Sequence, residues 1–224
     1  MSYIKNPSSI EKRSFQIIQS EIRDQYPDYQ FQSEMEESII KRCIHTTGDF
    51  DYLQTLEFHQ DAIESILSVF QEKGTILFDS PISLNGINKR VLDKMGVTYV
   101  CLVPQGCGLK SGKTRAQQAI DLAKEIAGPK LFAFGESTEG LTYLLENMNA
   151  GELDAAAILA LPVGFLDVLE VKEAVRQSSL PSIVNAGYKG GATLVVAVLN
   201  AILYQAGQVE TEDYVRYSTK QNQE

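Results

Sequence analysis

The chain has 224 residues, of which 44% are hydrophobic and 22% are charged, as in ordinary globular proteins. Its formal net charge of −9 argues against nonspecific nucleic-acid binding, because that binding requires a basic surface. An acidic chain of this kind must meet an anionic substrate with local positive groups.

The sequence contains three cysteines and no C-x-x-C pair, at positions Cys43, Cys101 and Cys107. This pattern favours a reducing compartment. The two histidines, His45 and His59, lie in no zinc-ligand pattern, so we expect no metal. No secretion signal is visible, and the longest apolar stretch, 192–204, is shorter than the about 20 residues that span a bilayer. We therefore expect a cytoplasmic protein that does not associate with membranes.

The first third of the chain predicts helices, because apolar residues recur there at helical spacing. Ser8 or Ser9 is expected to cap a helix over residues 10–22. Further helices are expected over 33–44 and 60–71.

From residue 74 the pattern changes to short apolar runs that alternate with amphipathic segments. Strands are expected at 75–78, 98–103, 131–134, 156–159 and 182–184, with 52–58 as a further candidate. Helices are expected between the later strands, at 115–127, 138–148, 167–175 and 192–204. This alternation predicts a three-layer α/β fold: a mostly parallel sheet with helices on both faces, preceded by N-terminal helices. We see no linker and expect one domain over residues 1–224.

The segment I-H-T-T-G-D around His45 contains the best catalytic candidate. Histidine suits proton transfer near neutral pH, and Asp49, Thr46 or Thr47 would be able to fix its tautomer. The position is also typical of a helix C-terminus, with Gly48 in the left-handed conformation. From spacing alone, the helix cap is the preferred interpretation.

The segment GCGLKSGKTR at 106–115 follows a strand and precedes a helix, as a phosphate-binding P-loop does. Five residues separate its two relevant glycines where the motif has four, so the curvature that directs N–H groups at phosphate is not expected. The alternatives are a glycine loop capped by Ser111, or an anion site in which Thr114 and Arg115 lie at a helix N-terminus.

Two later segments also follow buried strands. In LPVGFLDVLEVK at 161–172, Pro162 and Gly164 would either admit close approach of a ligand or form a strand-to-helix turn after which Glu170 and Lys172 are solvated charges, and the turn is the preferred interpretation. NAGYKGGATL at 185–194 precedes a long apolar helix. Backbone N–H groups at Gly190 and Gly191 would either hold a carboxylate or form a tight turn without a ligand.

In chain order, these segments resemble the precorrin-8X methylmutase family, also called precorrin isomerases, over residues 7–204. The resemblance rests on RSFQII at 13–18, IHTTGD at 44–49, TR at 114–115, LPVGF at 161–165, the Glu170 and Lys172 pair, GGA at 190–192 and Asn200.

The resemblance implies a homodimeric isomerase of vitamin B12 synthesis that acts on a tetrapyrrole, precorrin-8X or cobalt-precorrin-8. The methyl group at C-11 would move to C-12, giving hydrogenobyrinate or its cobalt counterpart. No cofactor would be needed, because the rearrangement is internal to the substrate. His45 would donate a proton or a hydrogen bond to a pyrrole nitrogen. The expected substrate-binding residues are Ser14, Asp79, Thr114, Arg115, Gly190 and Gly191.

The chain departs from the family pattern at GESTEGL, residues 135–141, where Glu136 and Glu139 would repel the carboxylates of such a substrate. An arginine that is usual before the glycine pair is also absent. These differences motivate a second hypothesis, a noncatalytic tetrapyrrole-binding protein on the same fold. A more distant alternative is a nucleotide-binding enzyme that uses residues 106–115.

Overall fold

The computed structural model describes residues 7–102 and 112–208, with side chains from residue 10 onward. In this part of the chain, one six-stranded sheet has the order β1-β6-β5-β4-β2-β3. Its strands are β1 (Leu56–His59), β2 (Thr75–Phe78), β3 (Thr98–Cys101), β4 (Lys130–Phe134), β5 (Ala157–Ala160) and β6 (Ser182–Asn185). The helices are α1 (Pro7–Gln25), α2 (Glu34–Thr47), α3 (Tyr52–Thr55), α4 (Ala62–Gln71), α5 (Pro81–Gly86), α6 (Lys89–Met95), α7 (Arg115–Lys124), α8 (Thr138–Asn149), α9 (Val168–Gln177) and α10 (Ala192–Ala206).

The sheet is parallel from β2 to β6, and β1 runs antiparallel beside β6 at one edge. Parallel neighbours require a crossover for each connection, and the helices between the strands supply these crossovers. The predicted α/β fold with a mostly parallel sheet is confirmed. The candidate strand at 52–58 is only half correct, because α3 occupies Tyr52–Thr55 and β1 starts at Leu56.

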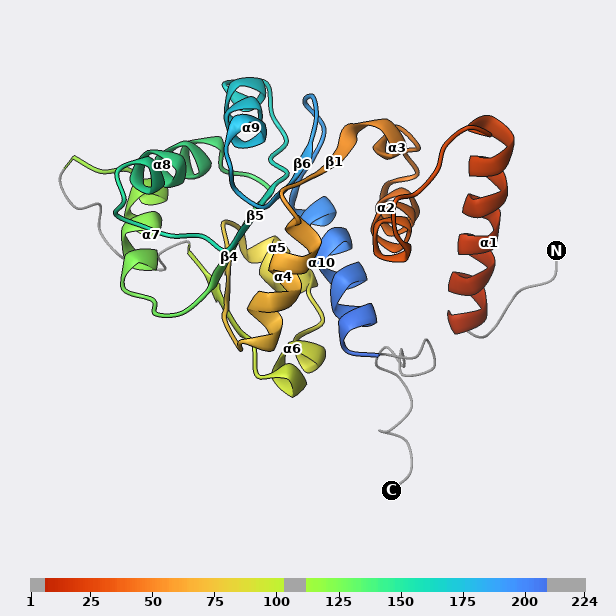
Figure 1. The fold of residues 1–224 in the computed structure, drawn as a ribbon, viewed down its shortest axis with the longest axis horizontal. Helices are drawn as coiled ribbons and strands as arrows, with labels where there is room; N and C mark the ends of the chain where they lie inside the picture. Colours follow the sequence, from red (N-terminus) through yellow and green to blue (C-terminus); the bar gives the residue numbers. More distant parts are fainter. Residues whose placement is uncertain (1–6, 103–111, 209–224) are drawn as a thin grey trace.

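Helices cover both faces of the sheet (Figure 1). On one face, α7, α8 and α9 pack against strand side chains that include Leu77, Phe132 and Ile158. Alternate strand residues such as Ile76 and Leu131 point to the other face, against α4 and α10. Because successive side chains of a strand point to opposite faces, a sheet covered on both sides needs continuous apolar strands, and β2, β5 and β6 are buried throughout.

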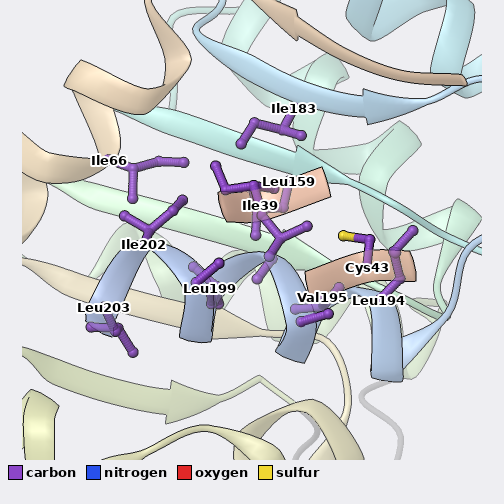
Figure 2. Close-up of a cluster of buried hydrophobic side chains, with 14 of the residues drawn as sticks. Ile39, Cys43, Ile66, Leu159, Ile183, Leu194, Val195, Leu199, Ile202 and Leu203 are labelled. Carbon is purple, nitrogen blue, oxygen red and sulfur yellow. The ribbon is translucent and has the colours of Figure 1, made fainter. Parts of the chain in front are cut away.

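Helix α10 is the centre of the larger core. It is apolar around most of its circumference, as expected of a helix that is surrounded by protein. Figure 2 shows its side chains beside those of the sheet, α4 and α2: Leu194, Val195, Leu199, Ile202 and Leu203 beside Leu159, Ile183, Ile66, Ile39 and Cys43. Helix α2 packs on α10, and α1 packs on the far side of α2 (Figure 1).

One expectation about the helices is wrong, and two short helices were not predicted. Helix α1 begins at Pro7, so neither Ser8 nor Ser9 is its N-cap. The connection between β2 and β3 contains α5 and α6, which are too short to give a clear helical repeat in the sequence. The buried side chain of Asn200 holds this connection, because its amide accepts from the Asn88 N–H and donates to the Gly86 carbonyl at 2.9 and 3.1 Å.

The substitution Leu199→Ala tests the importance of α10. Leu199 is fully buried, so its truncation leaves a cavity and should lower the free energy of unfolding by about 2–5 kcal/mol. Urea unfolding monitored by circular dichroism measures the change. The matched control is Leu122→Ala on α7, where 52% of the residue is exposed and the expected change is within about 0.5 kcal/mol. Equal losses in the two variants would contradict the central role of α10.

Candidate functional site

The strand order reverses between β2 and β4. Strand β3 lies on one side of β2, whereas β4, β5 and β6 are added in succession on the other side. In open parallel sheets, such a reversal leaves a crevice at the carboxyl ends of the strands, and ligands bind there. Asp79 directly follows β2 and Gly135 directly follows β4, so both residues lie at this crevice.

The carboxylate of Asp79 binds the backbone that follows β4. It accepts hydrogen bonds from the N–H groups of Gly135, Glu136 and Ser137, with distances of 2.7–3.1 Å. Burial raises the pKa of Asp79, although the three N–H groups act in the opposite direction. Asp79 therefore ties the end of β2 to the N-terminus of α8, and its oxygens are already engaged.

A cavity of about 370 Å³ opens beside Asp79, at the carboxyl ends of β2, β3 and β4. Its apolar wall includes Leu102, Ile120 and Phe134, and its polar wall includes Arg115, Glu136 and Glu139. A concave site that combines apolar walls with a few convergent polar groups is the usual form of a small-molecule site.

Arg115 reaches this cavity because it is the first residue of α7. The hydroxyl of Thr114 accepts from the N–H of Gln117, and the Gln117 side chain accepts from the N–H of Thr114, at 3.2 and 3.1 Å. This capping box starts the helix at a defined residue. Thr114 thus acts as a helix cap, while the exposed side chain of Arg115 has no ion pair within residues 10–102 and 112–208.

The cavity contains the side-chain carboxylates of Glu136 and Glu139. The hydroxyl of the buried Ser80 donates to Glu136 at 2.8 Å. Glu139 lies in the first turn of α8. The cavity consequently presents a guanidinium group and two carboxylates that are not paired with it, so a bound molecule would meet both signs of charge.

His45 lies in the last turn of α2 and is exposed. Its ring stacks on Phe15 of α1, with centroids 5.3 Å apart and planes at 15°. The guanidinium of Arg42 also lies over Phe15, 5.2 Å from the ring centroid, and pairs with Glu11 at 2.8 Å. The helix ends as predicted: Gly48 has a φ of 72° and donates to the Ile44 carbonyl at 2.7 Å. The cap interpretation is therefore confirmed, and it leaves the imidazole edge accessible.

The three groups expected to fix the tautomer of His45 are bound elsewhere. The hydroxyls of Thr46 and Thr47 donate to the carbonyls of Arg42 and Cys43, both at 2.8 Å. Asp49 accepts from Lys189 at 2.6 Å, and this contact lowers the pKa of Asp49 against the effect of its burial. Among the described residues, the contact recorded for the imidazole is therefore the stack on Phe15.

The loop between β6 and α10 lies next to the turn that follows His45 and also next to the chain after β4, beside the cavity. The Lys189 side chain reaches Asp49 and Asp51, both at 2.6 Å, on the side of His45. A Cβ atom at Gly190 would lie 2.2 Å from the Leu161 carbonyl oxygen, so only glycine fits there. The N–H of Gly191 donates to the same carbonyl at 2.8 Å and is not free to hold a carboxylate.

The predicted site residues consequently form two groups on one rim. Asp79 and Arg115 line the cavity, whereas His45 lies beside α1, where Ser14 precedes the stacked Phe15 and donates to the Ile10 carbonyl at 2.9 Å. The glycine loop connects the groups, because the backbone of Gly135 touches Ala192 directly after Gly191.

Sequence reasoning missed two lysines at this rim. Lys172 was expected to be solvated with Glu170, but its residue is 2% exposed, whereas Glu170 is exposed as predicted. The helical repeat contains the missing signal, because Lys172 lies on the face of α9 that buries Val168, Val171 and Val175. Lys189 had no local signal, since its partners follow α2, far away in sequence.

Part of one sequence motif lies outside the described residues. The glycine segment at 106–115 is described only from residue 112, so the structure does not test the nucleotide-binding hypothesis. Within the described ranges, no group of three or more histidine, cysteine or acidic residues is arranged to hold a metal ion. In the same ranges, no helix is long and apolar enough to cross a bilayer.

Comparisons with known proteins agree on one family. The profile of the precorrin-8X methylmutase family matches residues 9–205. The cobalt-precorrin-8 methylmutase of Salmonella typhimurium is 39% identical over 209 residues, covering 91% of this chain and 98% of its own. The precorrin-8X methylmutase of a Sinorhizobium species is 29% identical, covering 89% and 95%. The crystal structure of the precorrin-8X methylmutase of Thermus thermophilus superposes with a TM-score of 0.79 at 34% identity, covering 89% and 96%.

The similarity extends over nearly the whole described part of the chain and includes the His45 segment, the Arg115 segment and the glycine loop. The chain therefore belongs to the precorrin-8X methylmutase family, whose members are isomerases of cobalamin biosynthesis.

Proposed function

We propose that the chain moves the methyl group of precorrin-8X or cobalt-precorrin-8 from C-11 to C-12, with His45 as the acid. The observation that supports this role best is the exposed His45 ring, which is held flat on Phe15 at the carboxyl rim of the sheet. The 39% identical relative is a cobalt-precorrin-8 methylmutase, which favours the cobalt-bearing substrate.

In the proposed reaction, the bond between C-11 and its methyl group breaks as the bond to C-12 forms. Both bonds belong to one molecule, so the step needs no acceptor or oxidant. A proton or hydrogen bond from His45 to a ring nitrogen withdraws electron density from the conjugated system and prepares it for the shift. The stack on Phe15, which also contacts Arg42, keeps the imidazole in one plane. Such fixed orientation is a large part of what an enzyme contributes to an internal rearrangement.

The substrate carries acetate and propionate groups, and Arg115 is suited to bind one of them in a bidentate manner. Glu136 and Glu139 in the same cavity disfavour a second carboxylate there and so restrict how the macrocycle is oriented. Asp79, Thr114 and Gly191 support the site through the backbone contacts described above. Ser14 and Gly190 remain predicted substrate contacts.

We further propose a homodimer and a single domain located in the cytoplasm. An exposed apolar surface on the loop before α9, the first turn of α9 and the glycine loop supports the dimer: Val163, Phe165, Leu166, Leu169 and Tyr188. Phe165 and Leu166 are 87% and 79% exposed, and the Phe165 ring lies against that of Tyr188, with centroids 5.2 Å apart. Large exposed apolar side chains that gather in this way mark interaction sites. One sheet that carries both apolar clusters supports the single domain.

The substitution His45→Ala tests the proposed acid. It should lower kcat by about 10²- to 10⁴-fold and leave the circular dichroism spectrum unchanged, because the side chain is exposed. Turnover is measured by absorbance with precorrin-8X and with cobalt-precorrin-8. The matched control is His59→Ala, since His59 pairs with the first residue of β6 at the opposite end of the sheet and should keep wild-type kcat.

Wild-type kcat in the His45→Ala protein would disprove the assigned acid. Tight binding of the macrocycle by the unmodified chain, without any conversion, would instead select the noncatalytic binding protein.

The substitution Arg115→Ala tests carboxylate recognition in the cavity. Loss of a charge-assisted pair should raise KM about 10- to 100-fold and change kcat much less. Arg90→Ala on α6 is the control, because it removes the same charge from another exposed position. A rise in KM of equal size in both variants would indicate a loss of general electrostatic attraction and not of a specific contact.

The substitution Phe165→Asp tests the dimer. A charge in an apolar interface is poorly solvated, so the dimer should dissociate at a concentration at least about tenfold higher than the wild type. Sedimentation velocity measures the change. Leu122→Asp, at a 52% exposed position on α7, is the control and should keep the wild-type association state. A monomeric wild type, or a dimer unaffected by Phe165→Asp, would contradict this surface.

A further inference from the structure

Lys172 is a buried cation without an acidic partner. Its residue is 2% exposed, and no ion pair is recorded for it among residues 10–102 and 112–208. Its ammonium group donates instead to two backbone carbonyls, those of Gly187 and Lys189, at 2.7 and 2.8 Å. Both carbonyls belong to the glycine loop between β6 and α10.

Burial alone lowers the pKa of Lys172 to about 8, which shows that the environment disfavours its charge. An apolar side chain of similar length would avoid this desolvation, and replacing buried charges in that way is often neutral or stabilising. The contribution of Lys172 must therefore lie in what its two hydrogen bonds hold in place.

These hydrogen bonds hold a loop that reaches the segment after His45. The side-chain amide of Asn185 also donates to the Lys189 carbonyl, at 2.9 Å, so the backbone at this residue is held from two sides. The Lys189 side chain points outward to Asp49 and Asp51, at 2.6 Å each. Asp49 also accepts from the Asp51 N–H at 3.0 Å, which closes the turn after α2.

We propose that Lys172 is a positioning residue for the reaction, because it holds the loop 186–191 in the conformation in which Lys189 pairs with Asp49 and Asp51. Through this chain of contacts, Lys172 determines where the end of α2, and with it His45, lies relative to the rim of the sheet. The proposal rests on the proposed role of His45 as the acid.

The variant Lys172→Met keeps the length and packing of the side chain and removes its donors. We expect kcat to fall about 10- to 100-fold while KM changes less than about threefold, because the acid is displaced and Arg115 is untouched. Lys130→Met is the matched control: Lys130 also donates to a backbone carbonyl, that of Gly128, but at the amino end of β4, and should keep wild-type kcat.

Lys189 is exposed, so a substitution there does not disturb the packing of the core as a substitution of the buried Lys172 can. Lys189→Met should lower kcat to a similar extent, and the double variant should be about as impaired as the more severe single variant. Residues in one network are expected to show such non-additivity. Multiplicative losses, or wild-type kcat in Lys189→Met, would overturn the proposal.

Amide hydrogen exchange of the substrate-free protein provides a readout that is independent of activity. In Lys172→Met, we expect faster exchange at 186–191 and at 48–51 and unchanged exchange in β4 and α8. Unchanged exchange at both segments would overturn the positioning role even in an active enzyme. If the unmodified chain shows no turnover, the proposed function fails, and the exchange data still decide whether Lys172 holds the loop and the turn.

Discussion

The burial of α10 is the constraint on which the rest of the structure depends. This helix is apolar on nearly all sides, so it is stable only where protein surrounds it. The sheet and α4 cover it from one direction and α2 from the other, and α1 is then held by α2 (Figures 1 and 2). Helix α2, which carries His45, is thus held beside the sheet by its packing on α10.

The proposed substrate is polyanionic, and few polar groups on the described part of the rim are free to bind it in this acidic protein. Several polar groups there are occupied in building the site: Asp79 by three backbone N–H groups, the Gly191 N–H by a carbonyl, and Lys189 by two aspartates. Arg115 is the cation of the cavity that remains without an ion pair among the described residues. Recognition thus depends on placement more than on net charge.

The sequence was sufficient to predict the α/β class, most elements and the left-handed helix end at Gly48 after His45, because these follow from periodicity, capping and local motifs. Helix α5 and helix α6 escaped prediction since neither is long enough for a clear repeat. The partners of Asp49 and Asp79 were unpredictable for another reason: Lys189 and the backbone after β4 meet them only through the tertiary fold. Lys172 was predictable in principle, but the expectation that a lysine is solvated outweighed its position on the buried face of α9.

The contact between Gly135 and Ala192 has a mechanical consequence. At this point two backbones touch with no side chain between them, since a Cβ atom on Gly135 would lie 2.8 Å from both the N and the Cα atom of Ala192. Side chains absorb small displacements by changing rotamer, whereas main chains in direct contact have no such compliance. The start of α10 is therefore packed directly on the chain that follows β4, next to Phe134 and Glu136 of the cavity wall.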